Sequence, residues 1–247
     1  MVNIKYLEDA VLVGEKILVF GDFHVGYDGV GEMEGLLRVQ FKEIIEKLDR
    51  IFELVGSVEK IVVLGDLKHE FGGILDSEWS EGLKLLDYLS EKGEVILIKG
   101  NHDNILKPIA KKRGIELKNF YKLGDVCFMH GDKLFEQCLK GVGTLFVGHL
   151  HPAISLNDGY KNEKYKCFLK GDVKGFGGLK KGLKVYVLPS FSPMSYGYDL
   201  SKLKAESKKF SFILEDKRLK NFEVIIYNEK DDKIYEFGKL KKLIEKN

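Results

Sequence analysis

Five short runs of apolar, largely β-branched residues in this chain each lead directly into a cluster of glycine, aspartate, asparagine or histidine. The runs are ILVF before Gly21, IVVL before Gly65, VILI before Lys99, VCFM before His130 and LFV before Gly148. Such runs are typical of strands buried on both faces. Because open α/β sheets place their sites where strands end, we expect the five clusters to meet at one edge.

Between the first of these strands, apolar residues recur at the spacing of an amphipathic helix. We expect helices over residues 34–55, over residues 78–92 with Ser77 as N-cap, and, with a weaker pattern, over residues 105–113. From about residue 116 onward closely spaced strands dominate, and residues 222–227 and 233–237 are predicted to pair as a hairpin across NEKDD. Since no linker or internal repeat is visible and 44% of the residues are apolar, residues 1–247 are predicted to form a single α/β domain.

Lysines and glycines are dense between residues 161 and 184, in the middle of the strand-rich half. One interpretation of this stretch is a mobile insertion near the site. The other is a solvated surface hairpin. Its lysines are also the densest basic stretch available to flank a groove for nucleic acid.

The bulk composition narrows the class of protein. The 40 basic and 38 acidic residues leave a net charge of +2, so any binding of a polyanion must be local. The first residues lack the blocks of a signal peptide, and no apolar stretch reaches the roughly 18 residues of a membrane span. We therefore expect a cytoplasmic protein without membrane contact. The three cysteines, Cys127, Cys138 and Cys167, are too scattered for a disulfide framework and are expected to be buried fillers.

All six histidines of the chain fall within the polar clusters. These are GDFH at 21–24, GDLKH at 65–69, GNHD at 100–103, HGD at 130–132 and GHLH at 148–151. Neutral imidazole and carboxylate groups are the usual ligands of divalent transition metals. Their concentration in these clusters predicts a metal site assembled from distant loops.

The predicted ligands are oxygen and nitrogen donors from all five clusters: Asp22, His24, Asp66, Asn101, His130, His149 and His151. Seven donors exceed what one tetrahedral zinc uses, but they suit two cations that share a carboxylate, for which Asp66 is the natural bridge. Two cations roughly 3.5 to 4 Å apart favour phosphate ester hydrolysis, because together they hold the phosphoryl group and stabilise its charge. Protonation of the leaving oxygen needs an acid outside this set. His102 is the expected acid, and Asp103 is expected to orient its ring or to hold its proton.

In their order along the chain, the clusters resemble the motifs of the calcineurin-like metallophosphoesterase superfamily. That pattern is D-x-H, G-D, G-N-H-D/E, H and G-H-x-H, and it is complete between Asp22 and His151. The resemblance implies two stacked mixed β-sheets flanked by helices, a four-layer α-β-β-α fold, with His102 as proton donor. It also implies two metal positions that share Asp66, the first held with Asp22, His24 and His151 and the second with Asn101, His130 and His149.

Two longer segments narrow the resemblance. GDFHVGYD with GDLKHEF, followed later by LPSFSPMSYGYD, is similar to small prokaryotic phosphoesterases whose bacterial relatives are associated with a DNA ligase and a helicase. DNA or another phosphodiester is therefore a candidate substrate. His69 and Tyr27 are candidate substrate contacts, although a structural role for either residue is an open alternative.

These observations together predict a dinuclear phosphoesterase, more specifically a phosphodiesterase or nuclease, in which a metal-bridging hydroxide attacks phosphorus. Manganese is the first expectation for both cations, and iron, cobalt, nickel or zinc would also suit the donors. The alternatives are a phosphomonoesterase or nucleotide pyrophosphatase on a small metabolite, and a non-catalytic protein-binding scaffold. A homodimer is a further expectation, with Phe191, Tyr196 and Tyr198 either in its contact, in the core or at the rim of the site.

Overall fold

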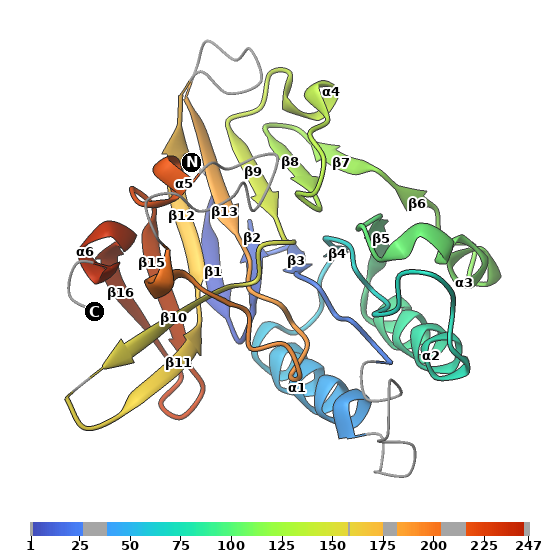
Figure 1. Cartoon of the computed structure of the whole chain (residues 1–247). Coiled ribbons are helices and arrows are strands. Elements are labelled where there is room, and N and C mark those ends of the chain that lie inside the picture. The colour runs from blue at the N-terminus through green and yellow to red at the C-terminus, as the bar shows by residue number, and fades with distance from the viewer. Residues whose placement is uncertain (1, 27–38, 158, 175–181, 204–215, 245–247) are drawn as a thin grey trace.

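The fold is that of a computed structural model, which describes residues 2–26, 39–157, 159–174, 182–203 and 216–244 (Figure 1). Its first sheet has the strand order β1-β2-β3-β4-β5-β6. The strands are β1 (Ile4–Leu7), β2 (Ala10–Val13), β3 (Ile17–Phe20), β4 (Lys60–Val63), β5 (Glu94–Ile98) and β6 (Leu117–Lys118). The strands from β3 to β6 are parallel, whereas β1, β2 and β3 are antiparallel neighbours.

The second sheet has seven strands in the order β16-β15-β12-β13-β9-β8-β7. They are β7 (Phe120–Leu123), β8 (Val126–Met129), β9 (Thr144–Val147), β12 (Phe168–Val173), β13 (Leu183–Val187), β15 (Glu223–Asn228) and β16 (Lys233–Lys239). Here β8, β9 and β13 are parallel. A small third sheet, in the order β11-β10-β14, consists of β10 (Pro152–Asn157), β11 (Asn162–Lys166) and β14 (Tyr198–Asp199).

Helices cover the outer faces of the two large sheets. α1 (Val39–Val55), α2 (Asp76–Lys92) and α3 (Lys107–Lys112) pack in one core cluster with side chains of the first sheet. Buried side chains of α4 (Glu136–Leu139), α5 (Asp216–Leu219) and α6 (Leu240–Ile244) belong to a cluster with the second sheet. Two short 3-10 helices, η2 (Asp103–Ile105) and η3 (Leu200–Lys202), complete the described elements.

The alternation of side chains along each strand produces the layers. In β3, Leu18 and Phe20 belong to the core with α1 and α2, whereas Val19 belongs to the core between the sheets. That middle core contains Val62 and Ile96 of the first sheet together with residues such as Phe128 and Phe146 of the second. The predicted stack of two mixed sheets flanked by helices is therefore confirmed.

The helices differ from the sequence prediction mainly at their ends. The helix predicted over 78–92 begins at Asp76, with Leu75 rather than Ser77 at its N-cap, because the Glu78 carboxylate turns back to accept the Leu75 N–H at 2.8 Å. The segment expected as one helix over 105–113 consists of η2 and the shorter α3. The helix predicted from residue 34 is described from Val39 onward, and residues 34–38 lie outside the described part.

The lysine-rich stretch is strand over most of its described length. It supplies β11, β12 and the start of β13, and residues 175–181 lie outside the described part. Residues 162–166 and 168–173 therefore pair as ordinary strands within two sheets. The hairpin predicted across NEKDD is confirmed, since β15 and β16 pair antiparallel.

The cysteines also differ from the expectation. All three are buried, but Cys127 of β8 and Cys138 of α4 form a disulfide, and Cys167 is free. The prediction of three unlinked fillers is therefore wrong for two of them, because packing of α4 on β8 brings the two thiols together. In the described residues, no helix has the length and apolar character needed to cross a membrane.

Candidate metal centre

The polar clusters come together as expected from the parallel strands. β3, β4 and β5 of one sheet and β8 and β9 of the other lead into the loops that carry the candidate ligands. The structure brings together all seven predicted ligands and His69, His102 and Asp103. Tyr27, the other candidate substrate contact, lies outside the described residues.

One group of donors consists of Asp22, His24 and His151, whose potential ligand atoms lie within 4.8 Å of one another. We call it the Asp22 group. The Nε2 atom of His151 lies 3.3 Å from Oδ1 of Asp22. Asp22 is fully buried and His24 is 4% exposed, whereas the His151 side chain is 19% exposed, so the group is reached from the side of His151.

A second group consists of Asp66, His130 and His149, again with donor atoms within 4.8 Å of one another. We call it the Asp66 group. His130 Nε2 lies 3.3 Å from Asp66 Oδ2, 3.1 Å from His149 Nδ1 and 2.9 Å from Asn101 Oδ1. Asn101 therefore belongs beside this group, as the resemblance implied.

The two groups adjoin one another at Asp66. Its Oδ2 atom lies 4.0 Å from His24 Nε2, on the side of the Asp22 group, and 3.3 Å from His130 Nε2. His130 Nδ1 in turn lies 3.4 Å from Asp22 Oδ1, although its closer contact is the Leu64 carbonyl at 2.9 Å. One carboxylate thus faces both sets of donors.

Four of these residues have a left-handed backbone that is uncommon for side chains other than glycine. The φ angles are 46° for His24, 48° for Asp66, 62° for His149 and 46° for His151. Such conformations cost free energy and cluster at functional sites, where the surrounding structure enforces them. Here they turn consecutive loops so that the side chains converge.

Two glycines allow the loops to approach closely. A Cβ atom at Gly100 would lie 2.0 Å from Asp66 Oδ1, which no side chain permits. At Gly65, where φ is 109°, a Cβ atom would lie 2.8 Å from His130 Nδ1. A larger residue at Gly65 or Gly100 would therefore clash with the centre, which explains the glycines before Asp66 and Asn101.

Burial and mutual contact shift the pKa values of the acids and imidazoles in the centre. Burial lowers the pKa of His24 to about 3 despite the neighbouring Asp22. Burial would also lower the pKa of His130, but Asp66 and Asp22 raise it to about 9. In the absence of a metal, the carboxylates therefore hold a proton on His130, and a cation would take over this charge balance.

The donors fit divalent metal ions on two grounds. Carboxylate, amide and imidazole groups are ligands that first-row divalent ions accept. In addition, Nδ1 of the buried His24 has no hydrogen-bond partner among the described residues, which is costly unless something else binds there. The candidate metal ligands thus form a preassembled set.

His102 lies next to the Asp66 group without belonging to it. Its backbone N–H donates to Asp66 Oδ1 at 2.8 Å, while its ring Nε2 is 3.9 Å from Asp66 Oδ2. The ring Nδ1 contacts the His69 carbonyl oxygen, and the half-exposed Phe71 ring lies over the imidazole with 3.5 Å between centroids. These contacts orient the His102 ring.

Asp103 is placed differently from the expectation. Its Oδ1 accepts the backbone N–H groups of Leu67 and Lys68, at 3.1 and 3.4 Å, and its Oδ2 accepts that of Gly100 at 2.9 Å. The described contacts therefore make the His69 carbonyl, rather than Asp103, the group that orients His102. Asp103 instead ties the loop after β4 to the loop after β5.

His69 comes within reach of the centre. Its ring lies 5.5 Å from that of His24 and 5.7 Å from that of His102, and the three histidines form a further set with donor atoms within 4.8 Å. The position of the ring suits the expected contact with substrate. The backbone carbonyl of His69 orients the His102 ring.

Sequence reasoning missed the polar residues that hold the Asp22 group from behind. Ser190 and Ser192 contact the Asp22 carbonyl, Gln40 contacts the His24 carbonyl, and Ser195 contacts the His151 ring. The serines belong to LPSFSPMSYGYD, which in the sequence only narrows the family resemblance. Gln40 is a buried polar residue within a helix, which no motif marks.

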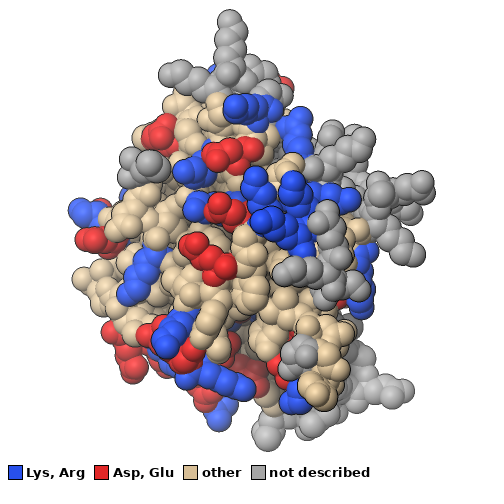
Figure 2. Space-filling model, turned by 90° about the vertical axis from the view of Figure 1, so that its left-hand side faces the viewer, with Lys and Arg blue, Asp and Glu red and all other residues tan. Residues whose placement is uncertain are grey.

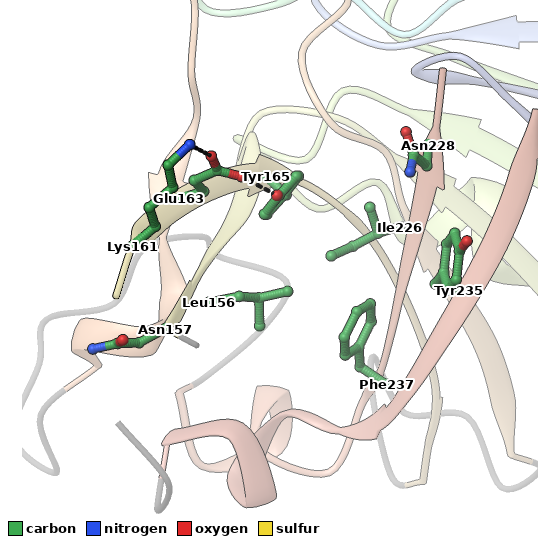
Figure 3. A pocket seen from close by; sticks show the side chains of 9 residues that line it. All are labelled: Leu156, Asn157, Lys161, Glu163, Tyr165, Ile226, Asn228, Tyr235 and Phe237. Atoms are coloured by element: carbon green, nitrogen blue, oxygen red, sulfur yellow. Dashed lines mark hydrogen bonds and ion pairs between the residues drawn. The ribbon is translucent and has the colours of Figure 1, made fainter. Parts of the chain in front are cut away.

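Two pockets differ in their relation to the centre. A pocket of about 460 Å³ opens beside it, lined by residues of two segments: His149, Leu150, His151, Met194, Ser195, Tyr196, Gly197 and Tyr198. Another, of about 300 Å³, lies between the β10–β11 and β15–β16 hairpins (Figure 3) and has Leu156, Ile226 and Phe237 in its wall. None of the predicted site residues lines this second pocket, so the chemistry is associated with the first.

Comparison with known proteins gives the family. The model of the calcineurin-like phosphoesterase family matches residues 15–188, which include every candidate ligand. The chain therefore belongs to the calcineurin-like phosphoesterase family. Membership makes it a hydrolase and implies divalent metals, for which the two donor groups are the candidates.

The structural comparison agrees at the level of the fold. The Pseudomonas putida nuclease MPE is similar with a TM-score of 0.62 and 16% identity, over 95% of this chain and 94% of that one. Vps29 of Entamoeba histolytica (14% identity, TM-score 0.36, over 89% and 97% of the two chains) and of Cryptosporidium parvum (13%, 0.36, over 90% and 97%) are more distant. No curated protein sequence matches the chain.

Proposed function

We propose that this calcineurin-like phosphoesterase is a dinuclear metal-dependent phosphodiesterase. The observation that carries the proposal is the position of Asp66, whose Oδ2 faces His24 on one side and His130 on the other. A carboxylate between two sets of donors is suited to bridging two cations. The Asp22 group, with Asp66, would hold one, and the Asp66 group, with Asn101, would hold the other.

The metals, when bound, would hold the phosphoryl group, stabilise its developing charge and lower the pKa of the attacking water. The protein residues would supply fixed positions for this chemistry. The strained loops and the glycine contacts preorganise the donors, so little reorganisation is needed when substrate arrives.

His102 would provide the proton for the leaving oxygen. Its ring is outside both donor groups, is oriented by the His69 carbonyl, and lies next to Asp66. An acid in this position can reach an ester oxygen on a phosphorus atom held at the centre. His69 is a candidate contact to the same substrate.

Manganese is our first candidate for both positions. The donors are mainly oxygen and imidazole groups, which manganese accepts, although the same set would bind iron, cobalt, nickel or zinc. Selection among these metals depends on their supply in the cell as well as on the ligands.

A nucleic acid or nucleotide is the substrate class we favour. The fold is similar to that of the P. putida nuclease MPE. Figure 2 shows lysine and arginine side chains gathered in one patch on the face that carries β16 and α6, which suits a phosphate backbone. The 161–184 lysines contribute less than expected, since Lys166 is largely buried and Lys170 pairs with Glu223.

The test begins with metal-free protein and bis-p-nitrophenyl phosphate. Adding manganese should restore hydrolysis, and Asp66→Ala should abolish it, whereas Asp87→Ala should not. Asp87 is the matched control because it is a carboxylate paired with Arg113, remote from the centre. Activity that survives exhaustive chelation, or survives in Asp66→Ala, would refute the proposal.

The second candidate is a phosphomonoesterase or nucleotide pyrophosphatase, which the same donors would serve. A comparison of monoester, diester, pyrophosphate and nucleic acid substrates under one metal separates these functions. Higher kcat/KM for the diester or nucleic acid supports our proposal. A strong preference for the monoester or for pyrophosphate would favour the alternative.

A further inference from the structure

The segment after β13 forms the back wall of the Asp22 group. Three groups of this segment donate to the Asp22 carbonyl oxygen: the Ser190 hydroxyl at 2.9 Å, the Phe191 N–H at 2.9 Å and the Ser192 N–H at 3.1 Å. Ser190 and Ser192 are buried, so these bonds are shielded from water. The main chain of Asp22 is therefore fixed by residues far from it in sequence.

The same segment contacts the other two members of the group. Ser195 Oγ lies 3.3 Å from Nδ1 of His151. The buried Gln40 side chain donates to Ser192 Oγ at 2.9 Å and to the His24 carbonyl at 2.8 Å. Residues 190–195 thus reach Asp22 and His151 directly and His24 through Gln40.

Lys166 holds this segment in place. Its Nζ atom donates to the carbonyl oxygens of Ser190 at 2.8 Å and Ser192 at 2.7 Å, and it pairs with Asp9 at 3.0 Å. An ammonium group has three donors, and these three acceptors use all of them. The side chain is 18% exposed, so the interactions form in a mostly dry environment.

Asp9 and Lys47 complete the support. Asp9, in the turn between β1 and β2, accepts from both lysines. Lys47 of α1 also lies 3.5 Å from the Phe191 carbonyl and 4.4 Å from the centroid of the Phe191 ring. The segment 190–192 is therefore clamped by β11, α1 and the β1–β2 turn.

We propose that Lys166 is a positioning residue for the metal held by the Asp22 group. It acts through Ser190 and Ser192, which fix the backbone of Asp22. This inference rests on the proposed metal-dependent function. The contacts described for residues 190–195 reach the Asp22 group and not the side chains of Asp66, His130 or His149. The effect of Lys166 should therefore be selective for one of two metals.

The experiment is a titration of the metal-free full chain with Mn²⁺ alone, in which electron paramagnetic resonance detects the unbound ion. Wild type should bind two ions. In Lys166→Met, which keeps the length of the side chain and removes its donors, the affinity for one ion should fall by about tenfold or more, as for other partners that orient ligands. The affinity for the other ion should be unchanged.

Lys170→Met is the matched control, because Lys170 lies on β12, the next strand along the chain, and pairs with Glu223 instead of the 190–192 segment. It should bind both ions like wild type. Ser190→Ala removes the hydroxyl bond to the Asp22 carbonyl and the longer contact with the Ser192 N–H, and it keeps the carbonyl that Lys166 binds. It should weaken the same ion as Lys166→Met, by a smaller factor. This variant decides the question if Lys166→Met does not fold.

The outcomes separate the two proposals. The positioning role would be overturned if folded Lys166→Met bound two ions with wild-type affinity. If Lys166→Met does not fold, the same result with Ser190→Ala would overturn it. Either result would leave the metal-dependent function intact. Equal weakening of both ions would also overturn the positioning role, because the effect would then be general. A wild-type protein that binds no Mn²⁺ and hydrolyses no phosphodiester would instead overturn the function on which the inference rests.

Discussion

The two halves of the candidate centre are held in different ways. The Asp66 group is supported by its own motifs: His102 donates to Asp66, Asn101 and His149 contact His130, and Asp103 ties the two loops together. The Asp22 group is supported from outside, by a segment after β13 that is itself clamped by distant charged residues. Similar donors can thus have local or remote support.

This difference matters for the independence of the two halves. Changes near the Asp22 group should act on one metal and leave the other half folded, because the Asp66 group depends on hydrogen bonds among neighbouring loops. Two residues link the halves: Asp66, which faces both groups, and Asp22, whose Oδ2 accepts the His149 backbone N–H at 3.1 Å. Substitutions can therefore test whether the halves are separable.

The largest expected effect comes from the two carboxylates. Asp22→Ala and Asp66→Ala should each lower kcat/KM by more than about 1,000-fold, since losing a metal removes more stabilisation than losing a single hydrogen-bond donor. The halves should differ in metal content: Asp66→Ala should lose both ions, whereas Asp22→Ala should retain one. Elemental analysis of the dialysed proteins measures this. Loss of both ions from Asp22→Ala would show that the halves are not separable.

The next largest effect concerns the outer support. Asp9→Asn should destabilise the protein by about 3 kcal/mol, because it removes the nearest counter-charge of the largely buried Lys47 and Lys166. Chemical denaturation measures the change in the free energy of unfolding. Glu59→Gln, which removes an exposed partner of Lys16, is the control and should have little effect.

Wild type and Asp9→Asn can also be compared as a function of pH. Burial would raise the pKa of Asp9, but Lys166 and Lys47 lower it below its ordinary value. The charged groups around Asp9 are Lys47, Lys166, Glu8, Arg50 and Glu229. Because the folded pKa is the lower one, the stabilisation is present above the ordinary pKa and is lost as pH falls. The difference between wild type and Asp9→Asn should thus shrink below about pH 4; a constant difference would contradict the assignment.

A slightly smaller effect is expected beside the Asp66 group, at His102, the proposed general acid. His102→Ala should lower turnover of a nucleotide diester by about 100-fold, in the range typical of general acids. Hydrolysis of bis-p-nitrophenyl phosphate should fall less, since nitrophenolate leaves readily without a proton. Mn²⁺ affinity should be unchanged, because His102 contacts Asp66 through its backbone N–H. Equal losses on both substrates would argue against His102 as the acid.

The same contrast explains what the sequence could predict. Asp22, Asp66 and His130 were identifiable because each follows a buried strand by a few residues, and parallel strands place such loops at one edge. The stacked sheets followed from the family resemblance, with which the order of elements is compatible. Local patterns therefore predicted the candidate donors, and the resemblance predicted the stack.

The remote support was not predictable for a physical reason. Lys166 and Asp9 are separated by 157 positions, and a pair of surface-type residues has no local periodicity that indicates a partner. The disulfide between Cys127 and Cys138 and the backbone contacts of Asp103 also depend on tertiary packing. Helix ends shifted for a related reason, since the Glu78 side chain, not Ser77, caps α2.

The smallest predicted effect concerns Gln40, which connects the segment after β13 to His24 within the Asp22 group. Gln40→Leu keeps the approximate volume of the side chain but removes the donor to the His24 carbonyl and to Ser192 Oγ. We expect about a tenfold loss of affinity for the metal of the Asp22 group, equivalent to about 1.4 kcal/mol, and no change for the other metal. Mn²⁺ titration measures both affinities, and Lys42→Met, on the exposed face of α1, is the control. If Gln40→Leu weakens the Asp66 group instead, support of the two halves is shared rather than divided.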